Sequence, residues 1–116
     1  MVNFALFGAG RIGRMHAENL VRRSDAKLLY VVDSKPEVAR ALAEPLGARQ
    51  ATQAEALKDS NVHAVLIATS TGSHADLSIA AAQAGKAIFC EKPLAVNARL
   101  AERMAAAVEK IGRAHV

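Results

Sequence analysis

Aromatic residues, cysteine and long apolar runs are all scarce in this sequence. Aromatics make up only 3% of the 116 residues, so a hydrophobic core has to be built from alanine, leucine, valine and isoleucine. The single cysteine, Cys90, excludes an internal disulfide and indicates a reducing compartment. No apolar run approaches the length of a membrane span, and residues 1–7 lack the pattern of a signal peptide. We therefore expect a cytoplasmic protein without a membrane partner.

Acidic residues are outnumbered by basic ones, which gives a formal net charge of +4. The basic residues are scattered and have few aromatic neighbours, so the sequence does not indicate a nucleic-acid partner. Arg11 and Arg14 flank a glycine-rich segment, and the remaining basic residues are best explained as a solvated surface. The four histidines and one cysteine show no metal-ligand spacing, so no metal site is expected.

Three of the glycines fall in one motif, Gly8-Ala-Gly-Arg-Ile-Gly13. A short apolar strand is predicted before it at residues 2–7, and a helix after it at residues 14–23. A second apolar run at residues 28–32 ends at Asp33, twenty residues past Gly13. This combination is the fingerprint of a dinucleotide-binding unit. Gly8 allows the tight turn, Gly10 lets a pyrophosphate approach the backbone, and Gly13 allows close packing of helix on strand.

The rest of the chain alternates helices and apolar strands. We expect strands at residues 48–51, 64–68 and 87–90. The expected helices begin at capping boxes at Ser34–Glu37 and Thr52–Glu55, at a cap formed by Ser73–Asp76, and at Asn97. Pro36 is expected in a first turn and Gly47 at the end of that helix. The expected apolar faces of the helices include Ile12, Val21, Ala41 and Ile79. This pattern predicts an α/β fold, a Rossmann-type doubly wound parallel sheet of five to six strands in one domain, residues 1–116. The strand ends that would bind a ligand carry Gly8, Asp33, residues 69–72 and residues 91–93.

Glu91-Lys92-Pro93, following the fifth predicted strand, makes a family resemblance specific. Together with the N-terminal glycine motif it resembles the glucose–fructose oxidoreductase and inositol dehydrogenase family, over essentially the whole chain. The segments 4–20, 64–69, 74–77, 84–86 and 90–94 are most similar to the inositol 2-dehydrogenase members. Ser70 departs from the proline that many relatives have there.

The resemblance implies an NAD(P)-binding domain of an enzyme that transfers a hydride between a polyol or sugar carbinol and a nicotinamide cofactor. It implies that Lys92 is catalytic, together with an Asp and a His on a second, C-terminal substrate domain. We expect that domain to be absent from these residues, the isolated chain to be inactive, and the full-length protein to form an oligomer. The expected cofactor-binding residues are Gly8, Gly10, Arg11, Ile12, Gly13, Asp33, Thr69, Ser70, Thr71, His74, Glu91 and Lys92.

Asp33 favours NAD over NADP, because its carboxylate accepts ribose hydroxyls and repels a 2′-phosphate. Lys35 could neutralise such a phosphate. Several roles stay open: His74 as a cofactor contact or a structural hydrogen bonder, His16 as a packing or surface residue, and Glu91 as a ribose or lysine partner or a solvated residue.

Two other functions fit the same architecture. A dinucleotide-sensing regulator would keep the ligand and lose the chemistry. An S-adenosylmethionine methyltransferase also places an acid after its second strand, but Gly13 and the Glu-Lys-Pro motif argue against it.

Overall fold

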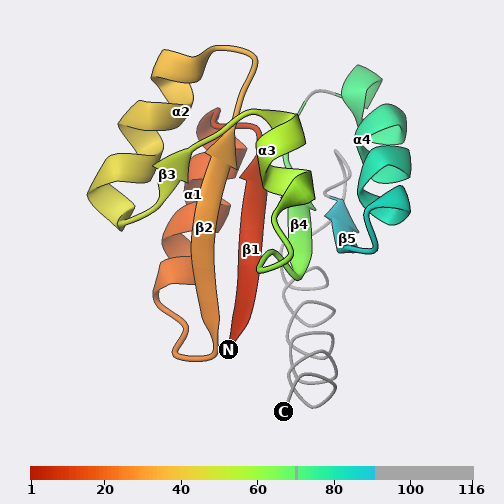
Figure 1. The fold of residues 1–116 in the computed structure, drawn as a ribbon. Coiled ribbons are helices and arrows are strands. Elements are labelled where there is room, and N and C mark those ends of the chain that lie inside the picture. Colours follow the sequence, from red (N-terminus) through yellow and green to blue (C-terminus); the bar gives the residue numbers. More distant parts are fainter. Residues whose placement is uncertain (70, 91–116) are drawn as a thin grey trace.

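The computed structural model describes residues 1–69 and 71–90. In these residues five parallel strands form one sheet in the order β3-β2-β1-β4-β5 (Figure 1). The strands are β1 (Val2–Phe7), β2 (Ala26–Val32), β3 (Arg49–Gln50), β4 (Ala64–Ile67) and β5 (Ala87–Cys90). The chain leaves β1 towards β2 and β3 and then crosses to β4 on the other side of β1. This is the predicted doubly wound topology, with its switch point between β1 and β4.

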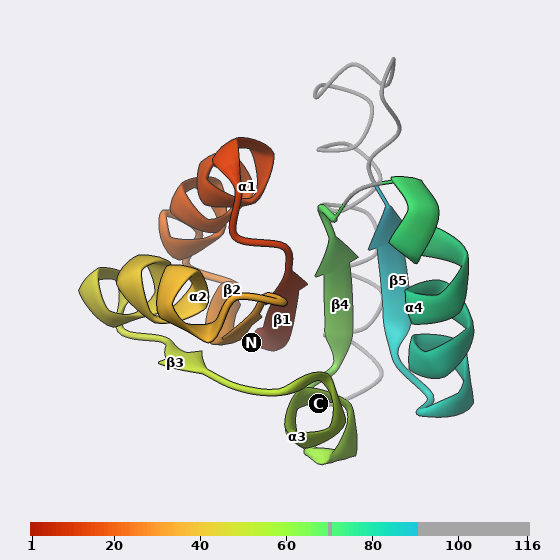
Figure 2. The ribbon, with the colours of Figure 1, turned by 90° about the horizontal axis from the view of Figure 1, so that it is seen from above.

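Helices cover both faces of the sheet (Figure 2). Helices α1 (Arg11–Val21) and α2 (Pro36–Ala43) pack on one face, and α3 (Gln53–Lys58) and α4 (Thr71–Gln83) on the other. Strand β1 serves both cores, because alternate side chains point to opposite faces. Phe4 and Leu6 belong to the cluster under α1 and α2, whereas Ala5 and Phe7 belong to the cluster under α3 and α4.

Helix α1 begins at Arg11, three residues before the predicted start, with Gly10 at the N-cap position. Its buried residues are Gly13, His16, Ala17 and Leu20. The prediction that Ile12 and Val21 belong to the apolar face is wrong, since their side chains are 43% and 39% exposed. The small residues Gly13 and Ala17 bring this helix close to the sheet, so the residues beside that stripe stay in solvent. His16 is 7% exposed and is a packing residue.

Helix α2 does not use the predicted capping box. Lys35, not Ser34, is its N-cap residue, and Pro36 occupies the first turn as expected. The backbone N–H of Lys35 donates to Asp33 Oδ1 at 2.9 Å. The expected burial of Ala41 is also wrong, since Ala39, Leu42 and Ala43 form the buried face. The chain continues through a 3-10 turn, η1 (Glu44–Leu46), to Gly47, whose φ of 76° ends the helical segment as predicted.

The capping box of α3 is present as predicted. Glu55 N–H donates to Thr52 Oγ1 at 3.2 Å, and Thr52 N–H donates to Glu55 Oε1 at 2.9 Å. Helix α4 starts at Thr71, so Ser73 lies inside the helix and the prediction that it forms the cap is wrong. Leu77 and Ala81 are buried, whereas Ile79, which was expected in the core, is 57% exposed.

The helix predicted from Asn97 lies outside the described residues. No helix within residues 1–69 and 71–90 is long and apolar enough to cross a membrane.

Candidate functional site

The carboxyl ends of β1, β2 and β4 bring three predicted site segments together. The glycine loop follows β1, Asp33 follows β2 and Thr69 follows β4, and these strands are neighbours in the sheet. In open α/β sheets this edge, beside a topological switch point, is where ligands bind. The sequence motifs therefore meet at one edge, as their positions after the strands predicted.

Glycine is required at position 8 because the backbone there passes close to the residues that follow β4. Its φ is +106°, and a Cβ there would lie 2.6 Å from the carbonyl oxygen of Ala68. Its N–H donates to the carbonyl of Val32 at 2.8 Å, which ties the start of the loop to β2. Gly13 closes the same turn, because a Cβ there would collide with the carbonyl oxygen of Gly8. Both glycines are thus required by the path of the chain.

Gly10 stands in a different environment. Its φ of −73° and ψ of −165° are open to any residue, and a Cβ would meet nothing within 4 Å. The first α-helical hydrogen bond of α1 runs from Arg14 N–H to Gly10 O at 2.9 Å. The N–H groups of the first turn have no carbonyl partner within the helix and carry the positive end of its dipole. The open space at Gly10 is therefore suited to an anionic group such as a phosphate.

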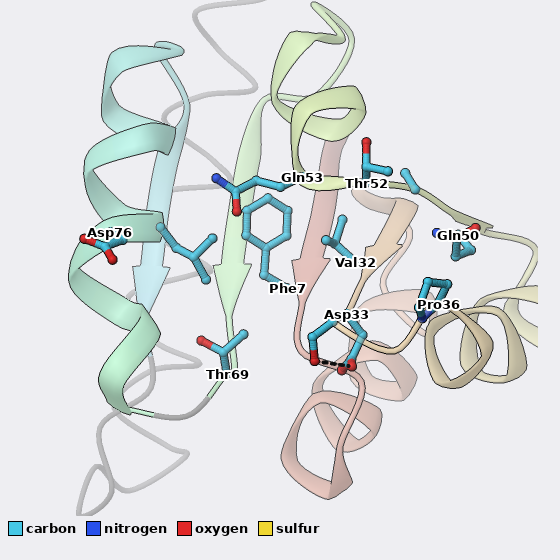
Figure 3. Close-up of a pocket in the computed structure, with 12 residues that line it drawn as sticks. Phe7, Val32, Asp33, Pro36, Gln50, Thr52, Gln53, Thr69 and Asp76 are labelled. Carbon is cyan, nitrogen blue, oxygen red and sulfur yellow. Dashed lines mark hydrogen bonds between the residues drawn. The ribbon is translucent and has the colours of Figure 1, made fainter.

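Asp33 is half-buried and holds two loops through its carboxylate. Its Oδ2 accepts the N–H of Ala9 at 2.8 Å, and its Oδ1 accepts the N–H of Lys35 at 2.9 Å. The hydroxyl of Ser34 lies 3.5 Å from Oδ1 (Figure 3). A carboxylate has about four acceptor positions, so this geometry leaves capacity for ribose hydroxyls.

A pocket of about 470 Å³ extends from Asp33 across the face of the sheet that carries α3 and α4. Figure 3 shows Phe7 and Val32 between Asp33 at one end and Gln53 at the other. Thr69, which follows β4, also lines the pocket (Figure 3). The lining residues are Phe7, Val32, Asp33, Ser34, Pro36, Gln50, Ala51, Thr52, Gln53, Thr69, Asp76 and Leu77. An apolar floor with a few polar groups at the rim is suited to a flat heterocycle with a polar attachment.

Sequence reasoning missed most of this pocket. Gln50, Thr52 and Gln53 follow or end β3, at the same edge as the predicted site. The rule that ligands bind at carboxyl strand ends could have identified them, because a third strand was expected at residues 48–51. Asp76 was expected in a helix cap, and both Asp76 and Leu77 lie in a segment that resembles the family, but neither was predicted as a pocket residue. The packing of α4 places them at the pocket.

The other predicted site residues are placed as follows. Arg11 and Ile12 are exposed in the first turn of α1. Thr71 and His74 belong to α4. Ser70, Glu91 and Lys92 lie outside the described residues. No group of three histidine, cysteine, aspartate or glutamate side chains within the described ranges could hold a metal ion.

Comparison with known proteins identifies the family. The profile of the oxidoreductase family with an NAD-binding Rossmann fold matches residues 2–116. Myo-inositol 2-dehydrogenase of Thermotoga maritima is 42% identical over 105 residues, which are 89% of this chain and 31% of that protein. The chain thus spans about a third of the length of this relative.

Solved structures agree with the fold. The structure of a putative myo-inositol dehydrogenase from Sinorhizobium meliloti 1021 superposes with a TM-score of 0.77 at 40% identity, covering 95% of this chain and 33% of that one. GenD2 from gentamicin A biosynthesis, solved in complex with NAD, gives a TM-score of 0.77 at 35% identity, covering 96% of this chain and 32% of that one. The predicted Rossmann-type doubly wound sheet, expected to have five to six strands, and the family resemblance are confirmed, with five strands in the described residues.

Proposed function

This chain belongs to the oxidoreductase family with an NAD-binding Rossmann fold, and from that premise we propose where and how it holds NAD. The pyrophosphate lies at the start of α1 beside Gly10, the adenosine ribose at Asp33, and the adenine in the pocket over Phe7 and Val32. One observation carries this proposal: the open space at Gly10, the Asp33 carboxylate and the apolar pocket are contiguous on one sheet edge.

Each part of the ligand has a matching chemistry in this site. The backbone N–H groups between Gly10 and Gly13 donate to phosphate oxygens, and they are fixed by the helix, so little ordering entropy is lost on binding. Asp33 accepts hydrogen bonds from ribose hydroxyls. The floor of the pocket removes the apolar faces of the base from water.

We propose that NAD is preferred over NADP. The Asp33 carboxylate is held in place by two backbone N–H groups, so it cannot easily turn away from a ribose 2′-phosphate. Two negative groups at contact distance repel each other, and the exposed Lys35 side chain is screened by solvent. The NAD complex of GenD2 supports the same cofactor.

For the whole enzyme we propose oxidation of a polyol of the inositol type. The name of the Thermotoga maritima relative supports this substrate class. Bound NAD would accept the hydride from the carbinol carbon. Lys92 would stabilise the negative charge that develops on the carbinol oxygen, as its place in the Glu-Lys-Pro motif implies. The Asp and His implied by the family resemblance would act with it, and the full-length protein would be oligomeric.

Titration of the chain with NADH, NADPH and S-adenosylmethionine, followed by calorimetry, tests the proposal. We expect saturable binding of NADH, weaker binding of NADPH, and no binding of S-adenosylmethionine. Tighter binding of NADPH would contradict the preference. Binding of S-adenosylmethionine alone would contradict the function.

A further inference from the structure

We propose that Asp33 is a positioning residue for the phosphate-binding loop, in addition to its role as a ribose acceptor. This inference rests on the proposed function, because it concerns the same dinucleotide site. It starts from the two shorter hydrogen bonds of the Asp33 carboxylate, which join the loop after β1 to the turn before α2; the third, from the Ser34 hydroxyl, is 3.5 Å long. Both shorter bonds are made to backbone N–H groups and not to side chains.

The Asp33 carboxylate gives the Ala9 N–H a hydrogen-bond acceptor that helix α1 does not supply. Ala9 is 4% exposed, and it precedes the N-cap residue Gly10, so its N–H has no carbonyl partner within α1. A buried N–H without a partner is unfavourable, so loss of the Asp33 carboxylate would favour a shift of the Ala9 N–H towards water. Such a shift would move the neighbouring Gly10.

The contacts of the two neighbouring glycines involve groups other than the Ala9 N–H. Gly8 is fixed by its N–H bond to Val32 and by its approach to Ala68. Gly10, in contrast, has open space around its Cβ position. The Gly10 carbonyl accepts the Arg14 N–H at 2.9 Å, a bond that anchors Gly10 without involving the Ala9 N–H, so the carboxylate orients the peptide between Gly8 and Ala9. Asp33 therefore sets the path by which the chain enters Gly10 and the first turn of α1, where the pyrophosphate is proposed to bind.

The positioning role of Asp33 and its negative charge have opposite effects on the affinity for a phosphate ligand, so a binding measurement can distinguish them. If Asp33 influenced the phosphate only through its negative charge, its removal would strengthen the binding of a diphosphate. If Asp33 positions the loop, removal weakens that binding, even for a ligand without ribose hydroxyls. The sign of the change distinguishes the two effects.

The experiment measures the dissociation constants of ADP and 2′,3′-dideoxy-ADP for the whole chain and its Asp33→Asn and Asp33→Ala variants. Asn has nearly the shape of Asp and one carbonyl oxygen, so it can accept one of the two N–H groups and should give an intermediate result. Asp25→Asn is the matched control. It removes the same charge at the opposite end of β2, where Asp25 pairs with Arg23 on the surface.

We expect Asp33→Ala to weaken 2′,3′-dideoxy-ADP binding about tenfold, the equivalent of one charge-assisted hydrogen bond. ADP should lose more, because the ribose contacts are lost as well. Asp25→Asn should leave both constants unchanged. Equal or tighter binding of 2′,3′-dideoxy-ADP by both Asp33 variants would overturn the positioning role. If Asp33→Ala does not fold, the 2′,3′-dideoxy-ADP affinity of the nearly isosteric Asp33→Asn variant tests the positioning role.

Amide hydrogen exchange of the ligand-free protein separates this proposal from the proposed function. Ala9 and Lys35 should exchange faster in the Asp33 variants than in the parent chain, with amides in β4 unchanged. Unaltered exchange at Ala9 would overturn the positioning role without any ligand being present. If the parent chain binds neither nucleotide, the proposed function fails, while the exchange rates still report whether the carboxylate holds the loop.

Discussion

The three glycines of the turn after β1 are needed for different physical reasons. Gly8 and Gly13 are required by the fold, because a Cβ at either position would clash with a backbone carbonyl oxygen. Gly10 is required by the proposed ligand, because its backbone angles suit any residue and the space beside it is open. Substitutions at the three positions should therefore separate folding from binding.

We expect Gly10→Ala to reduce NADH affinity more than tenfold, because the new methyl group occupies the space where the pyrophosphate approaches. Its stability should fall by only about 0.5–1 kcal/mol, the difference between glycine and alanine at an N-cap. The matched variant Gly13→Ala should lose about 1–3 kcal/mol or more through overpacking against Gly8. Calorimetric titration and urea unfolding measure the two quantities. A Gly10→Ala protein with unchanged NADH affinity would contradict the phosphate placement.

The two arginines at the start of α1 should contribute little to phosphate binding. Arg14 is exposed, and a long solvated side chain loses entropy when it is ordered against a phosphate. We expect Arg14→Ala to weaken NADH binding about threefold or less, on the order of 0.6 kcal/mol. The same titration checks this. A larger loss than that of Gly10→Ala would mean that side chains, not backbone N–H groups, hold the phosphates.

At the scale of elements, a polar contact links β2 to the end of α3 on the face that carries the pocket. Tyr30 Oη–H donates to Asp59 Oδ2 at 2.6 Å, and Asn61 N–H donates to Asp59 Oδ1 at 2.8 Å. The Tyr30 hydrogen bond, followed by that of the Asn61 backbone, lowers the pKa of Asp59. The same contact with Asp59 raises the pKa of Tyr30. Lys86 Nζ donates to the backbone carbonyl of Asp59 at 2.7 Å.

The signs of these pKa shifts define the pH range of the contact. A carboxyl group whose pKa is lowered in the folded state stabilises the fold above its ordinary value, about pH 3.9, and that contribution is lost as pH falls through the folded pKa. A tyrosine whose pKa is raised stabilises the fold below about pH 10 and loses its contribution as pH rises through the folded pKa. The contact is therefore at full strength between these limits.

Tyr30→Phe should lower the thermal unfolding midpoint at pH 7, and the difference from the parent chain should shrink as pH falls below about 4. Differential scanning calorimetry across this range provides the measurement. In an Asp59→Asn background the pH dependence of the Tyr30→Phe effect should disappear. The same difference at pH 3 and pH 7 would show that the charge of Asp59 does not strengthen the contact.

The sequence was most informative about elements with an apolar pattern and least informative about where helices begin. The strands predicted at residues 64–68 and 87–90 were found as β4 and β5, because buried parallel strands leave continuous apolar runs. The start of α1 was missed because its N-cap, Gly10, has no side chain to signal it. The capping box expected at Ser34 failed because Asp33, one residue earlier, accepts the Lys35 N–H.

The residues of the candidate site likewise fall into those that the sequence predicted and those that it did not. Gly8, Gly10, Gly13 and Asp33 were predictable, because each has a type and spacing that the dinucleotide fold demands. The far wall of the pocket was not, since Gln53 and Leu77 are common residues. They line the pocket because α3 and α4 pack on the sheet, and this packing cannot be predicted from a short sequence motif.

At the scale of the whole molecule, the described residues provide the proposed nucleotide site on one edge of the sheet. Within these 116 residues only Lys92 has motif support as a group that acts on a substrate hydroxyl, and the matched part of the Thermotoga maritima relative is 31% of its length. A lysine side chain by itself is a weak base near neutral pH, because the ordinary pKa of its ammonium group is about 10.4. We therefore expect this chain to bind the cofactor without catalysing the oxidation of a polyol.

We expect the 116-residue chain to bind NADH but to oxidise no polyol at a measurable steady rate. Hydride transfer requires a substrate held at contact distance from the nicotinamide and a base for the hydroxyl proton, and positioning alone supplies about 7–11 kcal/mol of rate enhancement. Incubation with NAD and myo-inositol, followed by NADH absorbance, measures turnover, and calorimetry in the same buffer confirms that the protein binds NADH. Robust turnover that is lost in Lys92→Ala would show that residues 1–116 hold a complete active site. In that case the substrate-binding groups would have to lie within this chain, and the division between cofactor and substrate domains that the family resemblance implies would not apply to it.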